Sequence, residues 1–339
     1  MKNYCILLFL ACFIFISPLS AKAFHLLILG DTEEPYIKYG VMKNIQNIEE
    51  VFSYLSMVSR ISLNSEKLIC TKRNLTRTHI LEWVKKEVVA PDDVIILYYS
   101  GHGIRTYESP TIWPSACSSS DGKDIEFSEI MEKLFLKKAA LYLVLLDCCN
   151  QLIEPKGVPR DGTPPNNYIT FDLKKLNEKR LITSCHELFF KSYGIIIASA
   201  ASPDEVGFID SKNKEFNRRG GIFSKVFLNY FLQELDSQHP QWQNIFKKTK
   251  RECLEETKKE KYTIIHSPLR HDYQTPQYKI FLHKRRRSSR VYREYLLKHC
   301  KWDSKSFPEI LADTIKQNQG ENILELDSDV VEEGDLVVQ

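Results

Sequence analysis

Short apolar runs alternate along the chain with segments whose apolar residues recur every three or four positions. Five nearly uninterrupted runs are rich in β-branched and aromatic residues: 24–30, 94–99, 141–146, 194–198 and 278–282. Such runs predict strands buried on both faces of a parallel sheet. Helical spacing of apolar residues predicts helices over 42–57, 76–89, 128–137 and 222–235. This alternation favours an open α/β sandwich, in which ligands bind beyond the carboxyl ends of the strands.

The first 23 residues have the pattern of a secretory signal peptide. Lys2 is followed by the apolar run 5–16, the helix breaker Pro18 and the A-x-A sequence Ala21-Lys22-Ala23. We therefore expect cleavage before Phe24 and a secreted or periplasmic product. The apolar run is too short to span a bilayer comfortably, so we expect no stable membrane span after the signal is removed. An uncleaved membrane anchor is the alternative.

One large domain is expected over 24–283, with two segments of different composition. Residues 151–191 hold a Pro/Gly/Asn cluster and several basic residues, which predicts a long surface connection that a protease could cut. From 284 to 339 a basic run is followed by an acidic stretch without aromatic residues. This composition predicts a basic linker and a mobile C-terminal tail.

Charge and cysteine content narrow the classes of function. The formal charge of +3 over 339 residues gives no reason to expect nucleic acid as a partner. Two of the nine cysteines lie in the leader, and the remaining seven leave at least one thiol unpaired within the chain. The spacings show no CxxC pair and no Cys/His ladder, which argues against structural zinc. We expect no metal or other cofactor.

Two short sequences at the ends of predicted strands contain the reactive side chains. YYSGHG (98–103) ends the run 94–99, and LLDCCN (145–150) ends the run 141–146. We expect His102 to be exposed between two glycines and able to move protons near neutral pH. A cysteine thiolate is a strong nucleophile that such a histidine can assist, and Gly103 leaves its backbone N–H unobstructed for an oxyanion. The pair predicts acyl transfer by a Cys–His dyad.

The order and spacing of these sequences resemble a known family. His102 precedes Cys149 by 47 positions, and caspases place their histidine about 50 residues before the nucleophile. The motifs are most similar to those of metacaspases and their bacterial relatives. HLLILGD, GIIIASAASPDEVG, RRGGIFSKVF and HDYQTPQYKIFL resemble further family segments, so the likeness extends over about 24–282. It implies a caspase-like three-layer α/β/α sandwich with a mostly parallel central sheet, and protein or peptide substrates.

The resemblance also implies roles for individual residues. In metacaspases the nucleophile is the second residue after the aspartate, so Cys149 is the implied nucleophile and His102 its proton partner. The backbone N–H groups of Gly103 and Cys149 are the implied oxyanion hole. Alternation along an extended backbone would place Asp147 and Cys149 on one face and send Cys148 into the core.

The implied pocket for the residue before the cut contains Asp147 and Ser100. A buried carboxylate favours a cation, so Asp147 suggests a basic residue at that position. Metacaspases usually have a second aspartate where this chain has Asn44, which weakens the case for strict specificity. Some metacaspases depend on calcium, but their sites cannot be mapped onto this sequence.

Two functions from different classes follow. The first is a secreted caspase/metacaspase-like cysteine endopeptidase that cleaves after a basic residue and processes itself in the 151–191 segment. The second is a catalytically weak or inactive caspase-like binding or regulatory module, favoured by Asn44 and by the Asn150-Gln151 sequence in place of the usual H-S-G. A legumain-like or gingipain-like protease fits the two motifs less well.

Overall fold

A six-stranded sheet forms the centre of the molecule. The computed structural model describes residues 22–33, 37–106, 109–116, 124–152, 173, 176–210, 220–259 and 274–301. The strands lie in the order β12-β9-β7-β3-β1-β2. Their bounds are β1 Ala23–Gly30, β2 Ser62–Ile69, β3 Val94–Ser100, β7 Leu141–Asp147, β9 Tyr193–Ser199 and β12 Gln277–His283. Neighbours run parallel except β12, which pairs antiparallel with β9, so the predicted mostly parallel sheet is confirmed.

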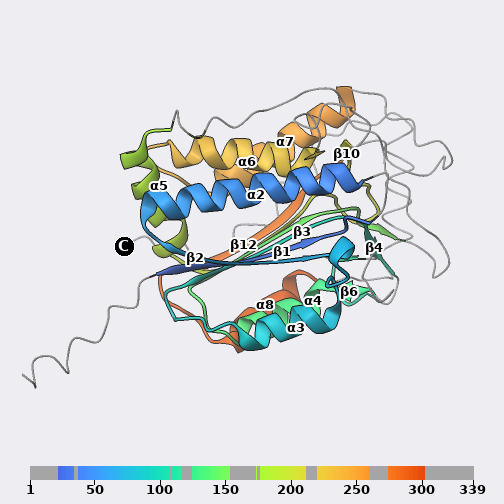
Figure 1. The fold of residues 1–339 in the computed structure, drawn as a ribbon, viewed down its shortest axis with the longest axis horizontal. Helices are drawn as coiled ribbons and strands as arrows, with labels where there is room; N and C mark the ends of the chain where they lie inside the picture. The colour runs from blue at the N-terminus through green and yellow to red at the C-terminus, as the bar shows by residue number, and fades with distance from the viewer. Residues whose placement is uncertain are drawn as a thin grey trace, which may run out of the picture.

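Helices cover both faces of this sheet (Figure 1). The upper layer in the figure contains α2 (Lys38–Ser59), α5 (Glu178–Phe190), α6 (Ile222–Leu235) and α7 (Trp242–Lys259). The lower layer contains α3 (Arg77–Lys86), α4 (Phe127–Phe135) and α8 (Ser289–His299). The predicted α/β/α sandwich is therefore confirmed. Among the described segments, no helix has both the length and the apolar character needed to cross a bilayer.

Short elements gather beyond the carboxyl ends of the main strands. A four-stranded sheet joins β6 (Ile125–Glu126), β5 (Ser115–Ala116), β4 (Gly103–Arg105) and β8 (Gln151–Leu152). A second pair joins β10 (Ile209–Asp210) to β11 (Gly220–Gly221), and a 3₁₀ turn, η1, spans Cys70–Lys72. These elements surround the ends of β3 and β7, where the sequence places its reactive residues.

Side chains of each central strand alternate between two cores. Leu141, Leu143 and Leu145 of β7 join the upper core, which lies between the sheet and α2, α5 and α6. Tyr142, Val144 and Leu146 join the lower core against α3, α4 and α8. A strand turns successive side chains to opposite faces, so the same alternation determines where Asp147 and the residues after it point.

The segment 151–191 is not one long surface connection, and that expectation is wrong for its second half. α5 occupies Glu178–Phe190 and buries Leu181, Cys185, Leu188 and Phe189 in the upper core. These apolar positions recur at helical spacing, but charged and polar residues between them hide the pattern. The Pro/Gly/Asn cluster itself lies outside the described residues.

The expectation of a basic linker is likewise wrong for part of 284–339, because residues 289–299 form a helix. The Ser288 side chain accepts a hydrogen bond from Val291 N at the start of α8. Tyr292 and Leu296, one helical turn apart, are buried in the lower core. This short helix belongs to the domain, whereas the acidic tail lies outside the described residues.

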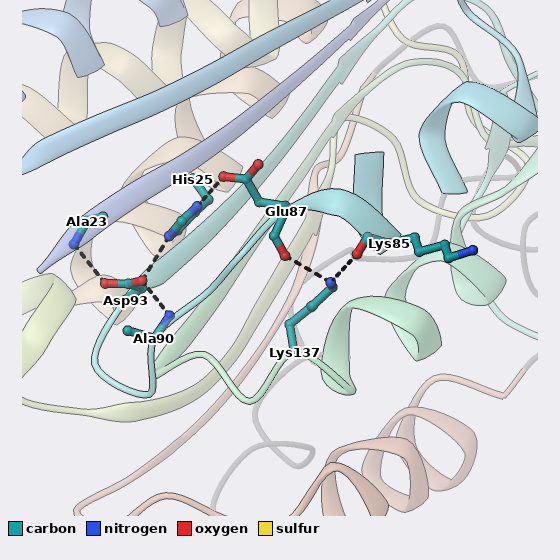
Figure 2. Close-up of polar contacts among 7 residues, drawn as sticks. All are labelled: Ala23, His25, Lys85, Glu87, Ala90, Asp93 and Lys137. Carbon is teal, nitrogen blue, oxygen red and sulfur yellow. Dashed lines mark hydrogen bonds and ion pairs between the residues drawn. The ribbon is translucent and has the colours of Figure 1, made fainter. Parts of the chain in front are cut away.

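At the amino ends of β1 and β3, a buried histidine lies between two carboxylates (Figure 2). His25 is 1% exposed; its Nδ1 lies 2.5 Å from Glu87 Oε1 and its Nε2 lies 2.9 Å from Asp93 Oδ2. Each ring nitrogen of His25 is thus within hydrogen-bonding distance of one carboxylate. Asp93 also accepts from the backbone N–H groups of Ala23 (2.9 Å) and Ala90 (2.6 Å).

A lysine completes the polar contacts at this end of the sheet. Lys137 Nζ donates to the carbonyl oxygens of Lys85 (3.0 Å) and Glu87 (2.9 Å) at the end of α3. These carbonyls have no partner within their own helix, so the lysine satisfies them. Together with His25, it ties β1, α3 and α4 to the loop before β3. The predicted signal peptide, apart from Lys22 and Ala23, lies outside the described residues.

Candidate active site

The ends of β1, β3 and β7 are level with one another. Ser100 pairs in register with Gly30 on one side and with Asp147 on the other. Asp31 N donates to Ser100 O (3.0 Å), and Gly101 N donates to Asp147 O (3.2 Å). Gly101 has a φ of 155°, and a Cβ there would lie 2.5 Å from Asp31 Cβ. Only glycine fits this exit from β3, and it leads the chain directly to His102.

His102 is buried rather than exposed as the sequence suggested. It is 8% exposed. Tyr99 from β3 donates its hydroxyl proton to His102 O (2.5 Å). The turn that carries the histidine is therefore fixed to the sheet that precedes it.

Gly103 lies directly against the two cysteines. A Cβ on Gly103 would lie 2.2 Å from Cys149 O and 2.6 Å from Cys148 Sγ. The adjoining β4 and β8 pair in parallel, with Ile104 opposite Gln151. The structure thus brings the two sequences that resemble the family motifs into backbone contact. It also places Gly103 and Cys149, the residues of the expected oxyanion hole, side by side.

The two cysteines face opposite sides of the sheet. Cys148 joins the lower core. Cys149 packs with Val206, Phe208, Ile222, Val226 and Cys253, beside α6 and α7. Its Sγ lies 3.3 Å from Gly207 N and 3.6 Å from Gly207 O, and the residue is 1% exposed. Cys149 therefore points to the same side as Asp147, and its sulfur is closed off in this conformation.

The three expected pocket residues form one hydrogen-bonded group. Asn44 from α2 donates through Nδ2 to Ser100 Oγ (2.9 Å) and to Asp147 Oδ2 (3.0 Å). Asn44 Oδ1 accepts from Gly221 N (2.8 Å). Residues separated by 56 and 103 positions in the sequence are thus in direct contact.

Asp147 also interacts with the amino-terminal turn of α6. Ser224 donates to Asp147 Oδ2 from both its backbone N (3.3 Å) and its Oγ (2.5 Å). Burial raises the pKa of Asp147 to about 6, while the hydrogen bonds from Ser224 oppose that rise. A helix amino terminus also favours a negative charge. The carboxylate is 0% exposed, and these hydrogen bonds fix its position.

Several residues that shape the site were not predicted from the sequence. Ser224 and Gly207 contact Asp147 and Cys149 across 77 and 58 positions, and no local pattern marks either contact. Glu205, which lies in the family-like segment GIIIASAASPDEVG, accepts hydrogen bonds from Ser202 N (3.1 Å) and Thr275 N (2.7 Å) through Oε2. Burial raises the pKa of Glu205 to about 7. This carboxyl fixes the loop that covers Cys149.

The described cysteines are all buried, and each is a thiol rather than half of a disulfide: Cys70, Cys148, Cys149, Cys185, Cys253 and Cys300. Burial raises the pKa of Cys185 to about 12 and that of Cys300 to about 11. Cys117 lies outside the described residues. Within the described ranges, His, Cys, Asp and Glu side chains form no group of three that could hold a metal ion.

Fold and site together define a caspase-like domain: a parallel α/β/α sandwich in which a His-Gly turn and a Cys-Cys turn meet at the strand ends. Residues 28–274 match the family described as Caspase domain, so the chain belongs to this family. Comparison with curated proteins gives no match.

Two solved structures are similar in outline. A crystal structure of a Geobacter sulfurreducens protein has a TM-score of 0.40 and 13% identity, and covers 75% of this chain and 92% of its own. Caspase-1 from Spodoptera frugiperda has a TM-score of 0.43 and 10% identity, with coverages of 76% and 88%. At these values neither likeness supports a conclusion about the site.

Proposed function

We propose that the protein is a secreted cysteine endopeptidase, closest within its family to metacaspases, that cleaves peptide bonds after a basic residue. The proposal is supported chiefly by the contact of Gly103 with Cys148 and Cys149. This contact puts a histidine turn and a cysteine turn together at the end of the sheet where α/β proteins bind ligands.

In the proposed reaction, the Cys149 thiolate attacks the scissile carbonyl carbon and forms a tetrahedral oxyanion. The backbone N–H groups of Gly103 and Cys149 stabilise this oxyanion. His102 protonates the departing amine as the C–N bond breaks, which leaves a thioester on Cys149. Water then hydrolyses the thioester with His102 as the base, and the thiol is restored.

The basic preference is supported by Asp147. Its carboxylate is buried on the same side of the sheet as Cys149, and Oδ1 has no hydrogen-bond partner among the described residues. An unpartnered buried carboxylate oxygen is unfavourable unless a donor reaches it. The side chain of lysine or arginine would supply that donor. Cleavage of the chain itself within 151–191 is part of the same proposal.

The test is turnover of fluorogenic peptides that differ only in the residue before the cut: Lys, Arg, Asn or Asp. We expect cleavage of the basic peptides, loss of it in Cys149→Ala, and its retention in the matched control Cys148→Ala. Absence of turnover with any peptide, while Cys149 is shown to be reduced, would overturn the proposal. Activity that survives Cys149→Ala but not Cys148→Ala would identify the other sulfur as the nucleophile.

A second candidate is a caspase-like binding module without effective catalysis. One observation favours it: Cys149 is 1% exposed and its sulfur is bracketed by the backbone N and O of Gly207. The rate of Cys149 alkylation as a function of pH separates the two functions. A catalytic thiol reacts well below the pH at which an ordinary cysteine ionises, whereas a permanently closed thiol reacts only after unfolding.

A further inference from the structure

The two oxygens of Asp147 have different surroundings. Oδ2 accepts three hydrogen bonds, from Asn44 Nδ2 and from the N and Oγ of Ser224. Oδ1 is fully buried and has no hydrogen-bond partner in the described part of the chain. A carboxylate oxygen has about two acceptor positions, so Oδ2 is saturated. A ligand donor can use only Oδ1.

Asn44 adds no second anionic group to this pocket. Both hydrogens of its amide are used, one on Ser100 Oγ and one on Asp147 Oδ2, and its Oδ1 faces Gly221 N. An aspartate in its place would bring a second carboxylate with free acceptor positions. In this chain the pocket instead holds one carboxylate, and one of its two oxygens has no hydrogen-bond partner among the described residues.

The backbone of β11 lies close to this carboxylate. A Cβ on Gly221 would lie 2.9 Å from Asp147 Oδ1 and 2.3 Å from Oδ2. The backbone of β11 therefore lies against the carboxylate, and no side chain can stand at position 221. Close packing on this side of the carboxylate favours a slender ligand group over a broad planar one.

We propose that this pocket selects lysine over arginine as the residue before the cut. The inference rests on the proposed function and adds the chemical class of the preferred side chain. A lysine ammonium is a compact point charge on a flexible stem and needs only one carboxylate oxygen. An arginine guanidinium is a planar fork that pairs best with two oxygens. Because Oδ2 is saturated, one arm of the fork would be buried without a partner, which is unfavourable.

The experiment compares peptides that are identical except for Lys, Arg or uncharged norleucine before the scissile bond. For the unmodified protein we expect kcat/KM to be at least about 10-fold higher with Lys than with Arg. Ser224→Ala removes the shortest of the three hydrogen bonds to Oδ2 and leaves Asn44 Nδ2 (3.0 Å) and the long contact from Ser224 N (3.3 Å). Oδ2 is then only partly used, so the Lys/Arg ratio should fall, but by less than in Asn44→Asp. Asn44→Asp supplies a second carboxylate and should bring the ratio to about one or below.

A matched control is Ser128→Ala, which changes a buried serine in the first turn of α4, on the opposite face of the sheet. It should leave the Lys/Arg ratio unchanged. If Asn44→Asp does not fold, as judged by thermal unfolding, Ser224→Ala still tests the inference.

The outcomes separate the inference from the function beneath it. No turnover of Lys or Arg peptides overturns the proposed function itself. Turnover with Arg equal to or better than Lys overturns only the lysine selectivity. If neither Ser224→Ala nor Asn44→Asp changes the Lys/Arg ratio, the explanation by the number of available oxygens is overturned. If both variants lower the ratio and Ser128→Ala does not, the explanation is supported.

Discussion

The two ends of one sheet each bury a group of polar side chains, and the groups differ in how their charges are satisfied. At the amino end, His25 lies between Glu87 and Asp93, with one carboxylate at each ring nitrogen, and both oxygens of Asp93 are hydrogen-bonded. At the carboxyl end, Asp147 has only neutral donors around it, and one of its oxygens has no partner within the described ranges. The polar atoms of the first group satisfy one another in the free protein, whereas the carboxylate of the second group has no cation beside it among the described residues.

This difference separates a structural site from one suited to binding. A buried charge is tolerated when a counter-charge and hydrogen bonds compensate for its lost hydration. The amino-end group meets that condition and should stabilise the fold. The carboxyl-end group does not, and it lies beside Cys149. Changes at the amino end should therefore alter stability, and changes at the carboxyl end should alter activity.

The largest effect is expected at Asp147. Asp147→Asn removes the charge but keeps an oxygen for Ser224, so the start of α6 should remain intact. On the proposed function, kcat/KM for a lysine peptide should fall by about 10³-fold, in the range for loss of one partner from a buried ion pair. The free energy of unfolding should stay the same or increase, because a buried charge is lost. Kinetics and urea denaturation of the same preparation measure both quantities.

If Asp147→Asn lowered the free energy of unfolding as much as His25→Leu does, the contrast between the two ends of the sheet would be contradicted. Asp147 would then have a structural role like that of His25. The norleucine peptide serves as the internal reference. Its slow cleavage should be almost unchanged by the substitution.

His25→Leu should have the next largest effect, on stability. It leaves two carboxylates facing a neutral side chain, and the free energy of unfolding should fall by about 3 kcal/mol. The activity per folded molecule, counted by titration of the active site, should not change. His239→Gln, at an exposed position, is the control and should affect neither quantity. A large loss of activity per folded molecule in His25→Leu would show that the two ends are coupled.

The dependence on pH should distinguish the ionised from the protonated pocket. The pKa of Asp147 is raised by burial to about 6, so the folded protein binds this proton more tightly than the unfolded chain. The contribution of Asp147 to stability therefore falls as pH rises from about 4 to about 6. Over the same range its charge appears, and kcat/KM for a lysine peptide should rise about tenfold per pH unit.

Asp147→Asn should remove the change between about pH 4 and pH 6 from both the stability profile and the kcat/KM profile. The difference between the two proteins isolates Asp147 from Glu205, whose pKa is also raised, to about 7. An acidic limb of the kinetic profile that remains unchanged in Asp147→Asn would assign it to another group.

Lys137→Met should have the smallest effect. It removes two hydrogen bonds to carbonyl oxygens at the end of α3, which water can replace in part. The free energy of unfolding should fall by less than about 1 kcal/mol. The kinetic constants should not change. A loss comparable to that of His25→Leu would mean that Lys137 holds the amino end together as strongly as His25 does.

The sequence predicted those parts of the fold that depend on local pattern. The bounds of α6 match the prediction, and five of the sheet strands were found from their apolar runs. β2 was missed because this edge strand, SLNSEKLI, is largely exposed and polar. α5, α7 and α8 were missed because their few buried residues are separated by charged ones. Each becomes a helix through packing on a core that the local sequence does not show.

At the site, alternation along β7 predicted correctly that Cys148 and Cys149 face opposite sides. The family resemblance selected Asn44, Ser100 and Asp147, which the structure joins by hydrogen bonds. The burial of His102 and the contacts of Ser224 and Gly207 depend on distant segments that fold over the strand ends. The catalytic roles of Cys149 and His102 and the binding roles of Asn44, Ser100 and Asp147 remain predictions.

The most direct test of the central claim is covalent labelling with a peptide chloromethyl ketone that ends in lysine. Its lysine side chain requires the Asp147 pocket, and its reactive carbon takes the nucleophile with loss of chloride. After digestion, mass spectrometry should find one equivalent of label on Cys149 and none on Cys148, and Asp147→Asn should slow the labelling strongly. Labelling of Cys148, or labelling of Cys149 at the same rate in Asp147→Asn, would contradict the account.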